Sequence, residues 1–315
     1  MTRNNVLCLD GGGAKGIYTL GILHEVESSL GEPIANHFDY FYGTSTGAII
    51  AALIADGKSV KYIKKLYLTQ IPSILSSPLA YCRTKRLTSL LKAQFGERRI
   101  TDIPRPLAIV SSSIENRRPT IFKSSEAMAH TRKSSFAPGF DRTIVEILRA
   151  SCAAYPFLNS MRLKGTDSQA SQTLLDGGFV ANNPTLFAMI DMKRALGLSN
   201  TEFTILSVGT GAFPIKYSIP FVLSALRLGF SASMVSLLFD LNSNTTDIIV
   251  KLLLSEVPVL RVNGSFTEPH LATNLLETNR KKLELLFDKG RDTFGAHETQ
   301  FNELFKKGND HANPS

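Results

Sequence analysis

Cysteine is scarce in this chain of 315 residues. The three cysteines, Cys8, Cys82 and Cys152, form no C-x-x-C pair. Their number and spacing exclude a disulfide framework and a zinc site built on cysteine pairs. The first residues also lack the long apolar segment of a secretory signal. We therefore expect a protein of the reducing cytoplasm.

Internal repeats, low-complexity stretches and a convincing linker are also absent, so we expect one domain over residues 1–315. With 43% hydrophobic and 20% charged residues, the chain can bury a sizeable core and is not a disordered protein. The motifs described below lie at about 5–212. A helical part is expected at 213–296, and the polar tail at 297–315 is expected to be flexible.

Acidic residues are outnumbered, and the net charge is +8. From Arg83 to Lys164 the chain has 16 Lys or Arg and 6 Asp or Glu, a local balance of +10. A basic face favours an anionic partner such as phospholipid headgroups, a nucleotide or nucleic acid. Because these charges are scattered singly and in pairs, the alternative is a solvated face that binds no partner. We expect no nucleic-acid polymer as a partner.

One apolar run is nearly free of charge. It extends from Ile219 to Phe239, contains Arg227 as its charged residue, and is long enough to be considered as a membrane span. Pro220, Gly229 and several serines favour a buried helix or helical hairpin instead. The third interpretation is an apolar face that contacts a bilayer or covers an active site.

Strand and helix patterns alternate along the chain, which predicts an α/β fold: a three-layer sandwich whose mainly parallel central sheet is flanked by helices. Strands are expected at Val6–Leu9, Phe38–Tyr42, Leu107–Ser111, Thr120–Lys123, Thr173–Leu175, Phe203–Val208 and Pro258–Val262. Helices are expected at Gly16–Leu30, from about Ser45, from Ser59 to about Thr69, at Thr143–Ala153 and at Leu271–Phe287.

Gly43-Thr44-Ser45-Thr46-Gly47 lies between a predicted strand and a predicted helix. The G-x-S-x-G pattern in this context is that of a nucleophile elbow. Gly43 and Gly47 would leave room for the strained turn, which holds the Ser45 hydroxyl at a helix N-terminus, where developing negative charge is stabilised. The alternative is an ordinary helix cap at Thr44 or Ser45.

A second glycine cluster, Asp10-Gly11-Gly12-Gly13-Ala14-Lys15-Gly16, follows the first predicted strand and opens a helix. Its unshielded N–H groups form a nest for an anion. One candidate anion is a pyrophosphate, because Gly11, Gly13 and Gly16 match the dinucleotide fingerprint, although Asp39 starts the second strand instead of ending it. The other is the oxyanion of an ester-cleaving reaction, which accounts for both glycine clusters and which we prefer.

A serine nucleophile needs a proton acceptor. His270 and His297 follow the serine in the order typical of α/β-hydrolases, but neither has a persuasive local setting. Asp176 is the better candidate, because it ends a short strand and Gly177-Gly178 give it room. It would lie at the edge where open α/β sheets place their sites. A simple Asp-Gly turn is the alternative.

These three motifs, in this order, resemble those of the patatin-like phospholipase family. Leu148–Ala154 and Ser207–Gly211 are similar to two further family motifs, and the similarity extends over about residues 5–212. The resemblance implies a Ser–Asp dyad without histidine, metal or cofactor. The residues that it assigns are Ser45 as nucleophile, Asp176 as general base, the amides of Gly11, Gly12 and Gly13 as oxyanion hole, and Lys15, Gly16, Gly43, Gly47, Gly177 and Gly178 as motif support.

The resemblance also implies the activity: a phospholipase A-type lipid acyl hydrolase that acts on membrane phospholipids at the inner face of the membrane. The family usually has Arg where this chain has Lys15, which keeps the charge but loses bidentate geometry. Some short bacterial members are immune effectors activated by a cyclic nucleotide, so a small nucleotide activator is expected. The sequence is compatible with a homo-oligomer. The rival function is that of a Rossmann-like dinucleotide-binding protein, which would use the Gly11–Gly16 loop.

Overall fold

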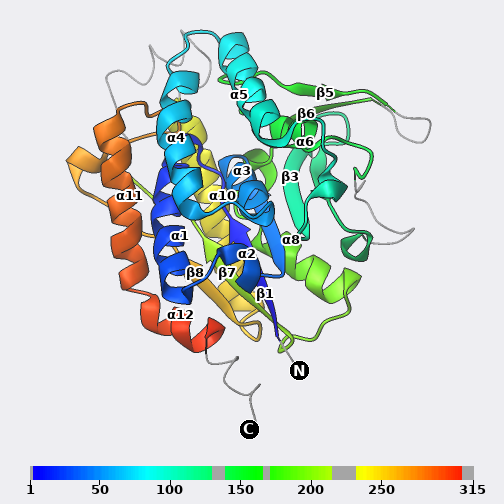
Figure 1. The fold of residues 1–315 in the computed structure, drawn as a ribbon, viewed down its shortest axis with the longest axis vertical. Helices are drawn as coiled ribbons and strands as arrows, with labels where there is room; N and C mark the ends of the chain where they lie inside the picture. Colours follow the sequence, from blue (N-terminus) through cyan, green and yellow to red (C-terminus); the bar gives the residue numbers. More distant parts are fainter. Residues whose placement is uncertain (1–2, 130–138, 166–170, 215–231, 307–315) are drawn as a thin grey trace.

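The computed structural model describes residues 3–129, 139–165, 171–214 and 232–306. In these residues, eight strands form one mixed sheet in the order β5-β6-β3-β2-β1-β7-β8, with β4 paired to β3 (Figure 1). The strands are β1 (Asn4–Leu9), β2 (Tyr40–Thr44), β3 (Leu107–Ser113), β4 (Arg118–Lys123), β5 (Met161–Leu163), β6 (Gln172–Asp176), β7 (Phe203–Val208) and β8 (Val259–Val262).

The centre of the sheet is parallel and one side is antiparallel. β1 runs parallel to β2 and β7, β2 to β3, and β7 to β8. β4 and β6 run antiparallel to β3, and β5 is antiparallel to β6. β7 is buried throughout and β1 is buried from Val6 to Leu9, which is typical of central parallel strands covered on both faces.

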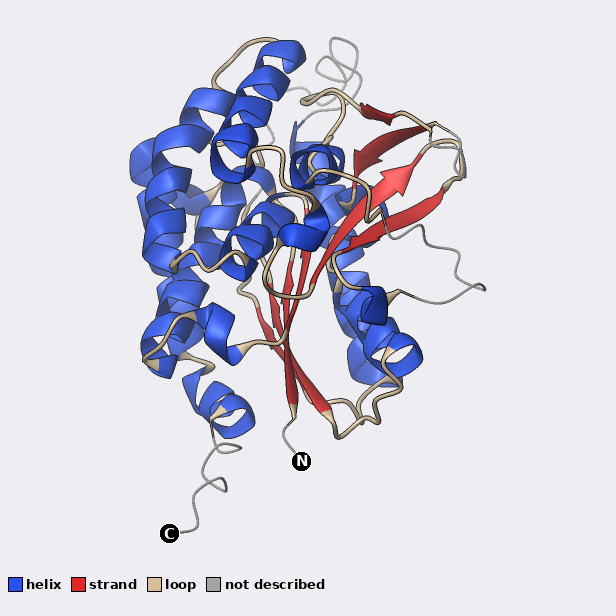
Figure 2. Cartoon of the chain, turned by 45° about the vertical axis from the view of Figure 1, so that its right-hand side comes forward, coloured by secondary structure: helices blue, strands red, loops and turns tan. Residues whose placement is uncertain are grey.

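Helices cover both faces of the sheet (Figure 2). Side chains of β1 alternate between two cores: Leu7 and Leu9 point into one, Val6 and Cys8 into the other. The first core is completed by α1 (Gly16–Leu30), α3 (Thr46–Ala55), α4 (Val60–Leu75), α5 (Ala80–Phe95), α6 (Ile144–Ser151), α11 (Arg280–Gly295) and α12 (Glu298–Phe305). The second is completed by α7 (Gly178–Ala181), α8 (Thr185–Ile190) and α10 (Ala232–Leu253). The predicted three-layer sandwich is confirmed.

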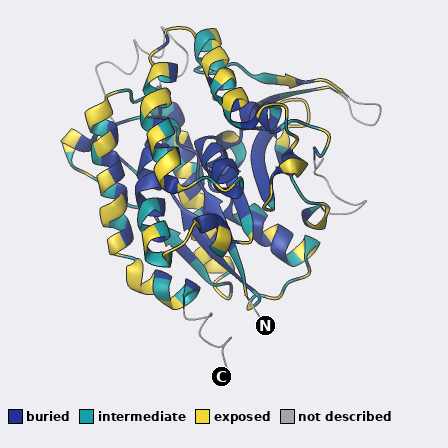
Figure 3. Ribbon diagram, in the orientation of Figure 1, coloured by how far each residue is buried: buried dark blue, intermediate teal, exposed yellow. Residues whose placement is uncertain are grey.

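The most deeply buried helix is α3. All its residues are buried, whereas α4 and α11 expose their outer faces (Figure 3). Its run of alanine and isoleucine has no polar side that water could cover, so the helix is stable only between the sheet and the outer helices. The N-terminus of α3 is therefore fixed at the carboxyl end of β2.

The sequence analysis missed or misplaced several elements. It missed α5 and β5, and it placed the second strand two residues too early. It predicted a helix at Leu271–Phe287, but α11 begins at Arg280, after Asn279, whose side chain accepts the Lys282 N–H at 3.3 Å. Such a side-chain cap is a strong helix start.

The prediction of a flexible tail from residue 297 is wrong for residues 298–305. These residues form α12, in which Phe301 and Phe305 are buried. The two rings stack with centroids 5.1 Å apart, and Phe305 also contacts Phe38 at 5.5 Å. The aromatic pair at helical spacing therefore anchors this polar segment to the core.

The apolar run Ile219–Phe239 lies mainly outside the described residues, which include only its end, from residue 232 in α10. Among the described helices, none combines the length and the apolar character needed to cross a bilayer.

Candidate active site

Ser45 and Asp176 are brought together by a single strand. Thr44 lies opposite Val110 of β3, and Asp176 lies opposite Ser111, the next residue of that strand. The carboxyl ends of parallel β2 and antiparallel β6 therefore meet along β3. There the Ser45 hydroxyl donates a hydrogen bond of 2.6 Å to Asp176 Oδ2.

The turn at Ser45 is strained. Its φ is 53°, in the left-handed region that non-glycine residues rarely adopt. The flanking glycines permit the turn, because a Cβ on Gly47 would lie 2.4 Å from the Leu9 carbonyl oxygen and one on Gly43 would lie 2.5 Å from the Cα of Ala48. The Ser45 side chain makes no capping bond to α3, so the simple helix-cap alternative is wrong.

Asp176 is fully buried. Burial raises the pKa of this carboxyl to about 7, although the hydrogen bonds from Ser45 and from the Gly178 N–H act in the opposite direction. The Gly178 N–H donates to Oδ1 at 2.7 Å, which leaves Oδ2 for Ser45. Gly177 has no space for a side chain, because its Cβ would lie 2.3 Å from the Val110 carbonyl oxygen.

The last residue of α6, Ser151, and the residues that follow it fix the positions of Ser45 and Asp176. Ser151 Oγ accepts the Ser45 N–H at 2.8 Å and donates to the Val110 carbonyl at 2.5 Å. The Asp176 N–H donates to the Ala153 carbonyl at 3.0 Å. Sequence analysis matched this segment as a motif but assigned no role to Ser151, and its position in Leu148–Ala154 was the available signal.

The glycine loop lies beside Ser45, since a Cβ on Gly11 would lie 3.1 Å from the Ser45 Cβ. The Gly11 N–H is already bonded to the Asn182 carbonyl at 3.1 Å, so it is not available as an oxyanion donor. The N–H groups of Gly12 and Gly13 have no partner among the described residues. Asn182, which sequence analysis missed, also donates from Nδ2 to the Gly11 carbonyl at 3.1 Å.

Three contacts fix the rest of the loop. The Ala14 N–H donates to the Leu275 carbonyl at 2.9 Å, and the Tyr67 hydroxyl donates to the Gly13 carbonyl. Lys15 is buried, and its Nζ lies 2.8 Å from Asp240 Oδ1 of α10. Lys15 therefore ties the loop to α10 instead of lying on the surface. Gly16 is required here as well, because its Cβ would lie 2.7 Å from the Tyr67 hydroxyl.

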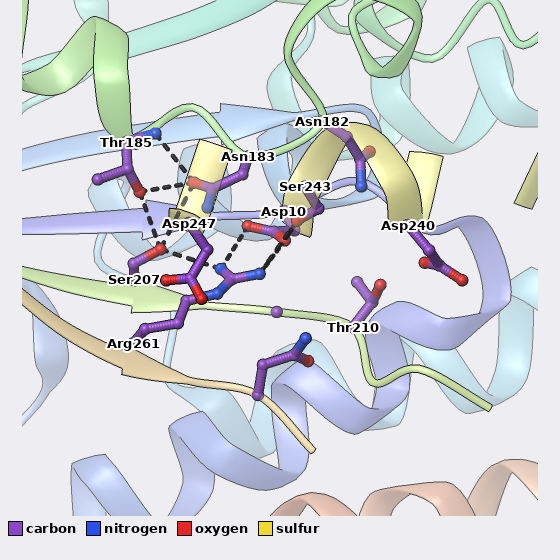
Figure 4. Close-up of polar contacts among 12 residues, drawn as sticks. Asp10, Asn182, Asn183, Thr185, Ser207, Thr210, Asp240, Ser243, Asp247 and Arg261 are labelled. Carbon is purple, nitrogen blue, oxygen red and sulfur yellow. Dashed lines mark hydrogen bonds and ion pairs between the residues drawn. The ribbon is translucent and has the colours of Figure 1, made fainter. Parts of the chain in front are cut away.

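A buried ion pair supports the first residue of this motif. Figure 4 shows the Asp10 carboxylate facing Arg261 of β8, with Ser207 and Ser243 beside them. Arg261 donates to both carboxylate oxygens, at 2.8 and 2.5 Å. The pair joins the ends of β1 and β8 to α10. Sequence analysis placed Asp10 in the glycine motif but missed Arg261 as its partner.

The two histidines that were weighed as bases lie elsewhere. His297 precedes α12 and its Nδ1 lies 2.9 Å from the Thr293 carbonyl oxygen. His270 is exposed in a short 3₁₀ turn, Pro269–Leu271. Neither hydrogen-bonds Ser45 in the described structure, which leaves Asp176 as the acceptor that the hydroxyl contacts.

The comparisons with known proteins agree with this geometry. The sequence matches the patatin-like phospholipase family over residues 7–189. It is also 40% identical over 299 residues to a cUMP-AMP-activated phospholipase of Escherichia coli, which covers 95% of this chain and 93% of that protein. The chain belongs to the patatin-like phospholipase family. As a family member it is a lipid ester hydrolase of the phospholipase A type.

This patatin-like phospholipase is also similar to one further sequence relative and to a solved structure. A cGAMP-activated phospholipase of Escherichia coli strain TW11681 is 27% identical over 66% of this chain, which spans 62% of that protein. Human GIVD cytosolic phospholipase A2 shares the fold, with a TM-score of 0.54 at 11% identity over 98% of this chain and 63% of that structure.

The rival dinucleotide-binding interpretation is wrong. It needs an acidic side chain at the end of the second strand, but Asp39 precedes β2 and its carboxylate accepts the Asn5 N–H at 2.7 Å. The end of β2 instead carries Ser45. Both glycine clusters of the phospholipase thus belong to one site.

Proposed function

We propose that Ser45 is the nucleophile and Asp176 the general base of this phospholipase, with the Gly12 and Gly13 amides as oxyanion donors. The observation that carries the proposal is the 2.6 Å hydrogen bond from Ser45 Oγ to Asp176 Oδ2. The Thr46 N–H is a further donor, because it begins α3 and has no partner among the described residues.

The proposed reaction has two halves. Ser45 Oγ bonds to the ester carbonyl carbon while its proton passes to Asp176, and the carbonyl oxygen becomes an oxyanion facing the glycine amides. The intermediate then breaks its bond to the lysophospholipid oxygen, which takes the proton from Asp176. A water molecule, deprotonated by Asp176, attacks the acyl-enzyme, and the fatty acid leaves as Ser45 regains a proton.

The pKa of Asp176 predicts the pH dependence of this reaction. A protonated carboxyl cannot accept the Ser45 proton, so activity depends on the ionised form. Because the pKa is raised to about 7, kcat/KM should fall as the pH drops through about 7 and should be steady above it. Fatty-acid release measured from pH 5 to 9 tests this. A rate that is unchanged down to about pH 5 would contradict a base with this pKa.

We further propose that the substrate is membrane phospholipid, reached from the cytoplasmic face, and that a cyclic dinucleotide activates the enzyme. Two cyclic-nucleotide-activated phospholipases are similar to this chain, one over nearly its full length. The basic segment Arg83–Lys164 supplies positive charge for either anionic partner. A role as an immune effector would follow from such gating and stays a prediction, as does a single domain over residues 1–315.

Activation is tested by fatty-acid release from liposomes of mixed phosphatidylethanolamine and phosphatidylglycerol, with and without cyclic UMP–AMP or cyclic GMP–AMP. We expect the rate to rise roughly tenfold or more with one of the two, since a ligand that binds the active state preferentially shifts the population by its differential affinity. Equal rates of fatty-acid release with and without each nucleotide would exclude activation by these nucleotides but would not exclude the Ser45–Asp176 dyad. No release under any condition would contradict the phospholipid substrate.

A further inference from the structure

Arg149 is a buried cation that has no acidic partner among the described residues. It lies in α6 and is 8% exposed. Within the described part of the chain its guanidinium makes one hydrogen bond, a long contact of 3.8 Å from Nη2 to Met161 Sδ. Buried charges are normally paired, as Arg261 is with Asp10, because an unpaired one is costly. Several strong donors of Arg149 are therefore left for another acceptor.

These donors face a pocket of about 440 Å³ between α5 and α6. Arg149 forms part of its wall, and Lys92, Thr84 and Thr88 contribute from α5. The Thr84 hydroxyl accepts the Asn159 N–H at 2.9 Å, and no described group accepts its own proton. The volume is in the range of small-ligand pockets.

The carboxylates of the pocket already have partners. Glu146 accepts from both the amide and the hydroxyl of Thr143 at 3.0 Å. Glu97 pairs with Lys92 at 3.4 Å, and both side chains are largely exposed. Glu146 bonds only neutral groups of Thr143, and neither carboxylate pairs with Arg149 among the described residues, so the guanidinium donors stay available to a ligand.

We propose that this pocket binds a phosphodiester group through Arg149, and that the activating nucleotide supplies it. The guanidinium fork matches two oxygens of a phosphate, and such charge-assisted bonds are among the strongest that a side chain makes. The nucleotide as source rests on the activation proposed above. A phospholipid headgroup carries the same chemistry and is the alternative source.

The pocket is directly connected to the catalytic residues. Arg149 lies two positions before Ser151, whose Oγ holds the Ser45 N–H and whose carbonyl accepts the Gly177 N–H at 3.2 Å. A ligand that moves Arg149 acts on the last turn of α6, and this turn positions both members of the dyad.

Isothermal titration calorimetry of the full chain with cyclic UMP–AMP, cyclic GMP–AMP and glycerophosphoglycerol tests the proposal. For Arg149→Met, which replaces the charge by an apolar side chain beside Met161, we expect a Kd for the nucleotide about 10- to 100-fold higher than in the wild type. Arg149→Lys should lie between them. The matched control is Lys85→Gln, which removes a charge on α5 at a residue outside the pocket and should bind as the wild type does.

The outcomes separate the two proposals. Unchanged nucleotide binding in Arg149→Met would overturn the pocket and leave nucleotide activation intact. Arg149-dependent binding of glycerophosphoglycerol without nucleotide binding would overturn the nucleotide as source and support a lipid headgroup. If the thermal unfolding of Arg149→Met shows that it does not fold, Lys92→Gln at the exposed rim replaces it, with an expected loss of severalfold. Unchanged affinity in that variant would contradict the pocket.

Discussion

Replacing Ser45 by alanine is expected to lower the rate of fatty-acid release from liposomes at least about 10³-fold. The substitution removes the only oxygen that contacts Asp176 Oδ2 among the described side chains, and with it the nucleophile that the buried carboxylate would deprotonate. The expected loss is in kcat, because the glycine loop that would bind the carbonyl is unchanged. Liposome assays at saturating activator measure it.

Further variants test whether the loss of activity is specific to Ser45 and Asp176. Asp176→Asn keeps the shape of the side chain but cannot accept the proton, so we expect a similar loss, and the double variant should be no slower than either single one. Ser89→Ala, an exposed serine of α5, should keep full activity. Wild-type protein should be labelled by an organophosphonate at Ser45, as located by mass spectrometry. Full activity in either dyad variant would exclude the proposed chemistry.

The proximity of Ser45 and Asp176 could be predicted from the sequence because the glycines beside them are steric requirements. Gly47 packs against the Leu9 carbonyl and Gly177 against the Val110 carbonyl, at distances where no Cβ fits. Such positions appear in the sequence as glycines beside a serine or an aspartate. The motifs therefore located the strand ends, although the register that joins them along β3 was not visible.

Other parts depend on contacts between distant residues and could not be predicted. Asp10 and Arg261 are 251 positions apart, and nothing local in either segment pairs them. The residues before α11 had a helical pattern, but the Leu275 carbonyl is used by the glycine loop instead. By contrast, α5 had a usable signal that was overlooked, because its buried residues Leu87, Leu91 and Phe95 recur at helical spacing.

The second large effect is expected from breaking the Asp10–Arg261 pair. Arg261→Met leaves the Asp10 carboxylate, which is 2% exposed, in the core without its cation. Removing one partner of a buried pair typically costs about 3–5 kcal/mol, because the remaining charge is not solvated. We expect the free energy of unfolding in urea to fall by that amount. Activity should fall as well, since Asp10 directly precedes Gly11.

The cause of this loss can be separated from the loss of packing. In Asp10→Asn with Arg261→Met, no charge remains buried, so the double variant should recover part of the stability that Arg261→Met loses. Arg280→Met breaks the exposed Arg280–Glu284 pair of α11, whose atoms lie 3.2 Å apart, and should cost less than about 0.5 kcal/mol. If Arg261→Met unfolds at the same urea concentration as Arg280→Met, the pair does not stabilise the fold. The Asp10 side chain would then be held by the hydrogen bond that Ser243 of α10 donates to its Oδ2.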